Sequence, residues 1–175
     1  MGGRARVFIV NTDLVKAGDY PSSLDDLLDA RWPASSIGIA NPLFGTTATQ
    51  AAALYAMRGP APAREFFKAL RARDIRVLDG NSVVRDLVAN GQLAFGLTDT
   101  DDAAGAIARG APVKIIAPDQ DKGGTLVIPG SVALIAGAPH PAEAKAIIDY
   151  LLSAEAEDAL IRSGRWATAQ NLLQP

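Results

Sequence analysis

The segment Ala40–Thr49 has the sequence Ala-Asn-Pro-Leu-Phe-Gly-Thr-Thr-Ala-Thr and decides the fold that we expect for this chain. It connects an apolar strand, Ile37–Ala40, to an Ala-rich helix through a Gly-Thr-Thr turn. Backbone N–H groups in the first turn of a helix have no partner within the helix and carry partial positive charge. Two interpretations are therefore open: Gly45, Thr46 and Thr47 hold an anion, or a threonine simply caps the helix.

Strands and helices alternate on both sides of this segment. The expected strands are Val7–Val10, Ile37–Ala40, Ile75–Leu78, Leu93–Leu97, Val113–Ala117, Thr125–Ile128 and Val132–Ile135. The expected helices are a short one after the Ser22-Ser23 cap, Thr49–Met57, Ala63–Arg73, one that Ser82 caps, Ala103–Ala108, Pro141–Leu152 and Ala154–Ser163. This alternation predicts the α/β class, with a mainly parallel sheet flanked by helices.

Polar side chains follow four of the expected strands. In a parallel sheet, ligands bind beyond the carboxyl ends of the strands. The candidate ligand-binding residues at these ends are Asn11, Asp13, Asn41, Gly45, Thr46, Thr47, Asn81, Ser82, Thr98 and Asp99. No general base or nucleophile accompanies them, so the pattern favours binding by hydrogen bonds over catalysis.

The composition excludes several classes of function. Of 175 residues, 49% are hydrophobic and 21% charged, which is typical of a soluble domain with a large core. The net charge of −2 does not favour nucleic acid or an anionic membrane as a partner. Without cysteine the chain forms no disulfide or thiolate metal site, and a single histidine, His140, excludes a multi-histidine metal site. No apolar run approaches the ~20 residues that span a bilayer, and we expect no signal peptide in this sequence.

Five sequence runs, in order and spacing, resemble the periplasmic substrate-binding proteins of ABC importers, in the ferric-iron branch of the extracellular solute-binding proteins. These runs are Val10–Leu14, Ile39–Thr47, Asp79–Val84, Gly96–Asp102 and Gly124–Pro129. The resemblance implies one lobe of a type II periplasmic-binding-protein-like fold, with hinge strands and C-terminal helices. It also implies a periplasmic location and an ABC permease as partner for the intact parent protein.

Proteins of this family have two lobes and roughly twice this length, so the resemblance implies that the chain is the C-terminal portion. Residues 1–13 would then form a hinge-crossing strand, residues 14–121 the α/β ligand-binding lobe, and residues 122–175 the return hinge strands and C-terminal helices that pack on a first lobe. The last helices carry an apolar stripe: Ala144, Ile147, Ile148, Leu151 and Leu152. Because exposed apolar side chains favour association, we expect a homo-oligomer or a domain-swapped dimer.

The resemblance also concerns the ligand. Family members bind a small anionic solute at a helix start, and the matching positions Gly45–Thr47, with Asn81 and Ser82 at a second helix start, favour the anion interpretation. No cofactor is expected, and ferric iron or a ferric chelate would be transported ligand. Members that bind the iron ion directly use two adjacent tyrosines, whereas no two tyrosines of this chain are adjacent.

An acidic cluster, Thr98-Asp99-Thr100-Asp101-Asp102, occupies the segment that matches those tyrosines. Asp99 and Asp101 are the pair most suited to a hard cation. The alternative is that Asp101 or Asp102 caps the next helix and Asp99 bonds to the backbone. A small α/β metal-dependent phosphatase or hydrolase that uses Asp99–Asp102 is the alternative function, although no lysine for a phosphate lies near these acids. Arg4 and Arg6 have two interpretations: they donate to a phosphate or, as expected so near the start of the chain, they are solvated.

Overall fold

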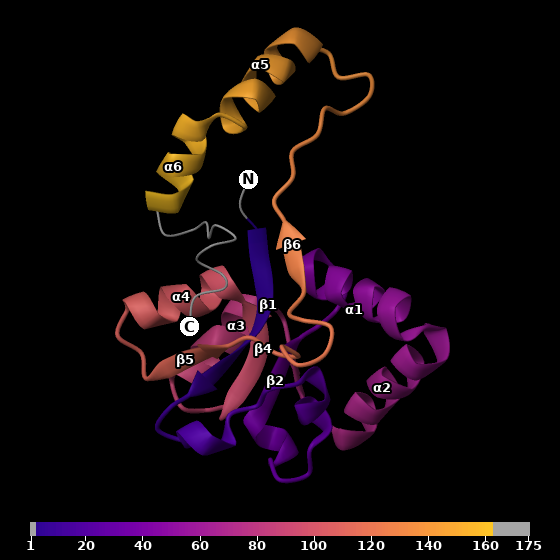
Figure 1. Cartoon of the computed structure of the whole chain (residues 1–175), viewed down its shortest axis with the longest axis vertical. Coiled ribbons are helices and arrows are strands. Elements are labelled where there is room, and N and C mark those ends of the chain that lie inside the picture. Colours follow the sequence, from indigo (N-terminus) through magenta and orange to yellow (C-terminus); the bar gives the residue numbers. More distant parts are fainter. Residues whose placement is uncertain (1–2, 163–175) are drawn as a thin grey trace. The chain divides into compact units, whose positions relative to one another are not determined.

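A computed structural model describes residues 3–162 of the chain (Figure 1). The chain divides into two compact units. The larger unit is Ala5–Leu126, and the smaller unit comprises, among the described residues, Gly3–Arg4 and Val127–Arg162. The two units are described separately below.

A sheet of mixed direction forms the centre of the larger unit. Its strands are β1 (Gly3–Asn11), β2 (Ile37–Ala40), β3 (Arg76–Leu78), β4 (Phe95–Asp99) and β5 (Val113–Ile116), in the order β3-β2-β4-β1-β5. β2 is parallel to β3 and β4, whereas β1 is antiparallel to β4 and β5. The predicted α/β class is confirmed, with one correction: β1 runs against the other four strands.

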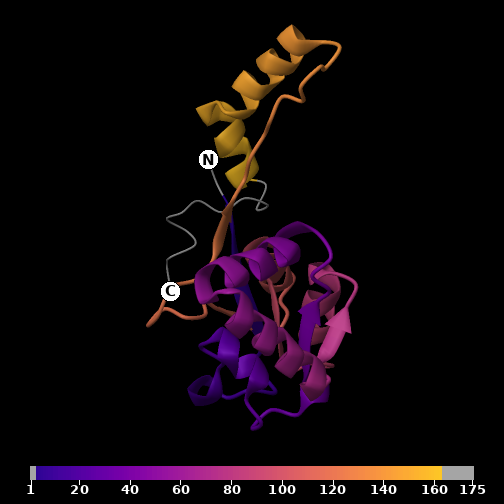
Figure 2. The same ribbon diagram turned by 90° about the vertical axis from the view of Figure 1, so that its right-hand side faces the viewer.

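Helices cover both faces of this sheet (Figures 1 and 2). They are α1 (Gly45–Arg58), α2 (Pro60–Arg73), α3 (Asn81–Ala89) and α4 (Thr100–Ala108), with short 3₁₀ helices at Ala17–Asp19, Leu24–Leu28 and Ala34–Ser36. Leu54 of α1 and Phe66 of α2 belong to the buried cluster that contains Phe95 and Leu97 of β4. Successive residues of a strand point to opposite faces, so Gly96 faces the other side, where α3 packs.

Gly38 of β2 leaves room for Leu93, whose Cδ1 atom would lie 2.6 Å from an added Cβ. Gly96 of β4 lets α3 approach the sheet closely, because a Cβ added there would lie 2.4 Å from Val84 Cγ1 of α3. Val84 and Val88 of α3 are completely buried at this contact. The close packing holds the first residue of α3 at the carboxyl edge of β2, β3 and β4.

Several predicted elements differ from the structure at their ends. α1 begins at Gly45, four residues before the predicted start, and α2 begins at Pro60. The predicted cap at Ser22-Ser23 is confirmed at Ser23, which forms a capping box with Asp26, although the helix that follows is a 3₁₀ helix.

The smaller unit contains β6 (Val127–Pro129), which pairs with β1, and the helices α5 (Pro141–Leu151) and α6 (Ala154–Arg162). Both predicted helices are confirmed over the described residues; Ser163 lies outside them. The predicted strand Val132–Ile135 is wrong, because a strand needs a neighbour for its N–H and C=O groups and this segment pairs with no described strand.

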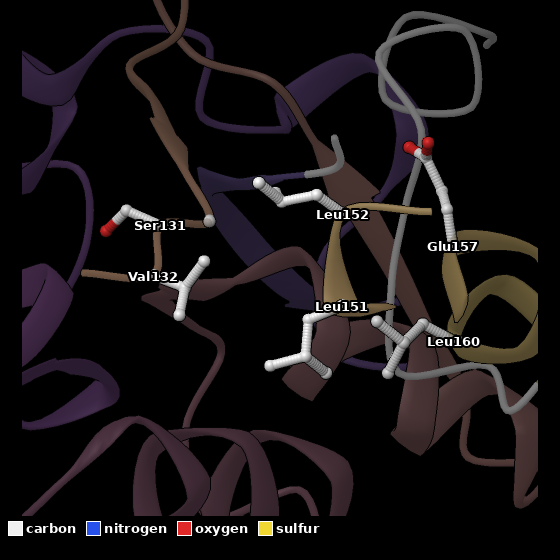
Figure 3. Close-up of a pocket in the computed structure, with 7 residues that line it drawn as sticks. Ser131, Val132, Leu151, Leu152, Glu157 and Leu160 are labelled. Atoms are coloured by element: carbon white, nitrogen blue, oxygen red, sulfur yellow. The ribbon is translucent and has the colours of Figure 1, made fainter. Parts of the chain in front are cut away.

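Apolar side chains of the smaller unit remain exposed. Ile135 is 78% exposed and Ile147 60% exposed, and the only hydrophobic residue buried among residues 127–162 is Ala156. Val132, Leu151 and Leu152 line an apolar pocket of about 150 Å³ within this unit (Figure 3). Among residues 3–162, no helix combines the length and the apolar composition that crossing a bilayer requires.

Candidate functional site

Three helices begin at one edge of the sheet. β2, β3 and β4 are parallel, so their carboxyl ends lie at the same edge, and α1, α3 and α4 follow these ends directly. The residues that precede or open these helices as N-caps are Phe44, Gly80 and Asp99, and none of the three forms a side-chain capping hydrogen bond. The predicted caps at a threonine of α1, at Ser82, and at Asp101 or Asp102 are therefore wrong. The first-turn N–H groups of α1 and α3 are left without a side-chain cap.

The carboxylate of Asp99 joins the three strand ends. Thr46 Oγ1 donates to Asp99 Oδ2 at 2.6 Å, and Asn81 Nδ2 donates to the same oxygen at 3.0 Å. Asn81 Nδ2 also donates to Thr46 Oγ1 at 3.1 Å, so the starts of α1 and α3 are linked directly. Three of the predicted site residues thus form one hydrogen-bonded network.

Arg6 of β1 completes this network, and the expectation that it is solvated is wrong. Its side chain is 0% exposed. Arg6 Nη1 donates to Asp99 Oδ1 at 2.6 Å and to Asn81 Oδ1 at 3.0 Å, and Arg6 Nε donates to Gln50 Oε1 at 2.8 Å. Burial lowers the pKa of Arg6 and the Asp99 carboxylate partly opposes that shift. Arg6 Nη2 is buried without a hydrogen-bond partner among the described residues.

Arg6 and Gln50 were not among the predicted site residues. The antiparallel pairing of β1 with β4 places Arg6 opposite Asp99, and no local sequence signal reveals that pairing. Gln50 lies four residues after Thr46 on α1, one helical turn away and on the same face, which is a signal that the sequence does contain.

Other predicted site residues lie around the network. Thr98 Oγ1 donates to the Asn81 carbonyl at 3.2 Å, and Thr47 Oγ1 approaches Asn81 Oδ1 at 3.4 Å; both threonines are buried. Gly45 opens α1 with a φ of +63° and is exposed. Asn41 and Ser82 are also exposed, at the end of β2 and in the first turn of α3.

Asn11 and Asp13 lie elsewhere, because β1 runs in the opposite direction and its carboxyl end is at the other edge of the sheet. Asn11 Nδ2 donates to the Val88 carbonyl at 2.9 Å, and Asn11 Oδ1 accepts from the N–H of Asp13 at 3.0 Å. The expectation that these two residues join the other strand ends is wrong. Asn11 instead holds a turn against α3.

The acidic cluster was predicted to offer a metal pair, Asp99 and Asp101. Asp99, Asp101 and Asp102 each have one carboxylate oxygen that lies within 4.8 Å of the corresponding oxygens of the other two. However, both oxygens of Asp99 already accept hydrogen bonds, and Asp102 Oδ1 accepts from Arg85 Nη1 at 3.1 Å. Two arginines thus balance charge that a cation would otherwise neutralise, and the metal pair stays a prediction.

Comparison with solved structures shows the fold. A ferric binding protein from Campylobacter jejuni is 20% identical with a TM-score of 0.84, over 96% of this chain and 56% of that one. The periplasmic binding protein AfuA from Actinobacillus pleuropneumoniae, solved with exogenous fructose-6-phosphate bound, is 27% identical with a TM-score of 0.79, over 99% of this chain and 55% of that one. The fold is one lobe, with further elements, of a type II periplasmic binding protein.

Sequence comparison agrees with this result. A putative 2-aminoethylphosphonate-binding periplasmic protein of Salmonella typhi is 28% identical over 154 residues, which are 86% of this chain and 45% of the relative. The chain therefore spans about half the length of the curated relatives that it matches. Residues 1–174 match a family described as bacterial extracellular solute-binding protein, and the chain belongs to that family.

Proposed function

We propose that this chain supplies the ligand-binding lobe of the solute-binding component of an ABC importer, and that the starts of α1 and α3 bind the phosphate or phosphonate group of a small organic solute. The observation that carries the proposal is the meeting of uncapped helix starts at one edge of the sheet. Such N–H groups and the helix dipoles favour an anion. A periplasmic location and an ABC permease as partner belong to the same proposal, because the Salmonella typhi relative is named a periplasmic protein.

The network beneath the helix starts defines how the solute would be held. The single hydroxyl proton of Thr46 and the amide protons of Asn81 are directed within the network, toward Asp99 and Thr46. The donors that remain for a solute are therefore the backbone N–H groups of the first turns and the exposed side chains of Asn41 and Ser82. Asp99 would repel an anion if it were unpaired, but its ion pair with Arg6 balances that charge. Thr46, Asn81, Asp99 and Arg6 thus act as positioning residues.

Two relatives more than a quarter identical support a phosphorus oxyanion. One is named for 2-aminoethylphosphonate, and the other was solved with fructose-6-phosphate bound. Both compounds carry a tetrahedral phosphorus group with several negatively charged oxygens. Ferric iron, or a ferric chelate such as the citrate complex, is the second candidate ligand. It has less support, because the ferric-binding structure from Campylobacter jejuni is only 20% identical and the oxygens of Asp99 are engaged.

Catalysis has no support from the comparisons. The family is one of solute-binding proteins and not of enzymes, and the relatives are named as binding proteins. The hydrolase alternative required Asp99–Asp102 to activate a water or a metal. Asp99 instead closes a structural network.

Ser82 offers a direct test of the anion site. It is exposed in the first turn of α3, so Ser82→Asp places a carboxylate there that stabilises the helix start but repels a solute anion. Ser82→Asn is the matched uncharged control. We expect at least a tenfold loss of affinity for 2-aminoethylphosphonate and for inorganic phosphate in Ser82→Asp, by isothermal titration calorimetry, and less than a threefold change in Ser82→Asn.

Thermal unfolding gives an independent readout of the same proposal. A ligand at 100 times its Kd stabilises the folded state by about 2.7 kcal/mol. Phosphate or 2-aminoethylphosphonate should raise the unfolding midpoint of the wild-type chain, and ferric citrate should not do so beyond the effect of citrate alone. Stabilisation by ferric citrate without stabilisation by either phosphorus compound would overturn the proposal in favour of iron.

We also propose that the chain self-associates through the smaller unit. Ile147, Leu151 and Leu152 are each at least 44% exposed on or directly after α5. Burial of such side chains is worth about 1.5–3 kcal/mol each, which favours a second copy as the cover.

A further inference from the structure

A pocket beside α1 is lined by Arg6 and Gln50 of the network and by residues outside it. Its volume is about 160 Å³, and it lies within the larger unit. One wall is the face of α1 that carries Gln50, Ala53 and Met57, and the opposite wall includes Gly123 and Leu126. Gln50 follows Thr46 by one turn, about 6 Å along the helix axis, so the pocket begins one turn from the proposed anion site.

Arg6 lies at the junction of the network and the pocket. Its Nη1 atom bonds to Asp99 and Asn81, and its Nε atom bonds to Gln50, which lines the pocket. Its Nη2 atom is buried with no partner among the described residues. A buried donor without an acceptor is costly, so an acceptor oxygen of a bound molecule would stabilise Arg6 Nη2. Gln50 uses its carbonyl oxygen for Arg6 and donates no hydrogen bond to the described residues.

The charges around the pocket are balanced. Arg6 pairs with Asp99, and Arg58 pairs with Asp25 at 2.7 Å. The Nζ atom of Lys122 lies 3.8 Å from the other oxygen of the same Asp25, and the buried Asp119 also lines the pocket. Three carboxylates therefore balance the three cations, so a second phosphate would meet no net positive charge here, whereas the unpaired donors of Arg6 and Gln50 suit the oxygen atoms of an uncharged group.

The volume gives the size of that group. A cavity of about 150 Å³ in another protein holds benzene, so this pocket holds about six carbon atoms. We infer that the pocket binds the uncharged, oxygen-bearing organic body, about six carbons in size, of the solute whose phosphate or phosphonate group binds at the starts of α1 and α3. This inference rests on the proposed function and excludes bare inorganic phosphate as the preferred solute. It also excludes 2-aminoethylphosphonate in that role, because the body of that compound has two carbons and an ammonium group; that compound remains a probe of the anion site alone.

A filling variant tests the inference with a matched control on the same helix. Ala53→Leu narrows the pocket from α1, while Ala52→Leu adds the same side chain at a neighbouring exposed position of α1 that does not line the pocket. Gly123→Val also narrows the pocket: Gly123 does not have a positive φ, and an added Cβ would lie 3.3 Å from Cε of Met57, the flexible end of a side chain that lines the same pocket. The probes are inorganic phosphate, glycerol 3-phosphate and glucose 6-phosphate, measured by calorimetry on the full chain.

The wild type should bind glucose 6-phosphate at least tenfold more tightly than inorganic phosphate, with glycerol 3-phosphate between them. Ala53→Leu and Gly123→Val should each remove that advantage and leave phosphate affinity within threefold, while Ala52→Leu keeps it. Circular dichroism and the unfolding midpoint confirm that each variant is folded, and the retained phosphate binding confirms an intact anion site.

Two results would overturn the inference alone. One is equal affinity of the wild type for phosphate and glucose 6-phosphate, and the other is an equal loss in Ala53→Leu and Ala52→Leu; phosphate binding would survive in both cases and keep the proposed function. Failure of all three phosphate compounds to bind the wild type would instead overturn the proposed function itself.

Discussion

Helices α2 and α5 have similar sequence patterns but very different surroundings. In the larger unit, Ala63, Phe66 and Leu70 of α2 are all buried against the core. In the smaller unit, α5 has no buried residue, and Ile147 and Leu151 remain exposed although they repeat at helical spacing. Amphipathic spacing therefore decides that a segment becomes a helix, whereas the partner that covers its apolar face must come from elsewhere in the fold.

The same contrast holds for ion pairs. The Arg6–Asp99 pair of the larger unit is almost completely buried and is joined by further donors, whereas Lys145 and Asp149 of α5 form an exposed pair four residues apart. Removing one member of a buried pair leaves an uncompensated charge in a poorly solvated site. An exposed pair is screened by water and contributes little.

The largest effect is expected from the same substitution at these two aspartates. Asp99→Asn should lower the free energy of unfolding by about 4 kcal/mol, because Arg6 loses its counter-charge. Asp149→Asn should lower it by less than about 0.5 kcal/mol. Urea denaturation of both variants measures the difference. Equal effects of the two substitutions would show that the network is not the structural centre that we describe.

The next largest loss of stability is expected from truncating a buried leucine of α2, and an exposed leucine of α5 serves as its comparison. Leu70 of α2 is 5% exposed and Leu151 of α5 is 44% exposed. Leu70→Ala should destabilise the chain by about 3 kcal/mol, through the lost transfer free energy and the cavity that remains. Leu151→Ala should cost less than about 1 kcal/mol under dilute conditions, because half of its surface is already in water. A loss at Leu151 as large as at Leu70, by urea denaturation at low protein concentration, would mean that α5 is covered within a single chain.

Self-association gives a third difference between the two units that depends on protein concentration. If a second copy covers α5, the wild type should self-associate at micromolar concentration, and Ile147→Lys should weaken that association by about 10- to 100-fold, equivalent to about 1.4–2.7 kcal/mol. Light scattering and sedimentation equilibrium measure both proteins. Lys145→Gln, on the same helix and equally exposed, is the control that should leave the association nearly unchanged. A monomeric mass for the wild type at tens of micromolar would contradict the proposed self-association.

The sequence predicted the site where the required information was local. The strands β2, β3 and β4 and the helices that follow them each come from a short apolar run, a polar turn and a helical pattern. Thr46, Asn81 and Asp99 were therefore placed correctly at neighbouring strand ends. The position of a helix start could be missed by four residues, as at Gly45, because glycine and threonine can each precede the first turn of a helix, and the run Gly45–Thr49 contains several of these residues in close succession.

Two errors at the site concern β1. The run Val7–Val10 shows that β1 is a strand, but the direction of a strand within the sheet depends on residues far away in the sequence. With β1 assumed parallel, Asn11 and Asp13 were assigned to the site. Arg6 was expected in solvent because it lies near the start of the chain, whereas the pairing of β1 with β4 buries it opposite Asp99. Because β1 runs antiparallel to β4, the start of β1 with Arg6, and not its end with Asn11, lies at the edge of the sheet that carries the site. The strand predicted at Val132–Ile135 failed for a related reason, since its apolar residues needed a pairing partner that the sequence cannot name.

The smallest effect on stability is expected at Asp86, an acid of the larger unit that, unlike Asp99, is exposed. Asp86 of α3 is exposed, and Arg85 Nε donates to its Oδ1 atom at 2.7 Å. This hydrogen bond lowers the pKa of Asp86. A carboxylate with a lowered pKa in the folded state contributes stability above its unfolded pKa of about 3.9, and that contribution is lost as the pH falls through the folded pKa.

Asp86→Asn should therefore lower the free energy of unfolding by at most about 0.5 kcal/mol at pH 6, since the pair is screened by solvent. The difference from wild type should shrink as the pH falls toward 3. Urea denaturation across this pH range measures the difference, and in an Arg85→Gln background it should nearly vanish at every pH. A cost that does not depend on pH would assign the effect of Asp86→Asn to helix propensity and not to charge. A cost as large as that of Asp99→Asn would remove the distinction between buried and exposed ion pairs on which the comparison of the two units depends.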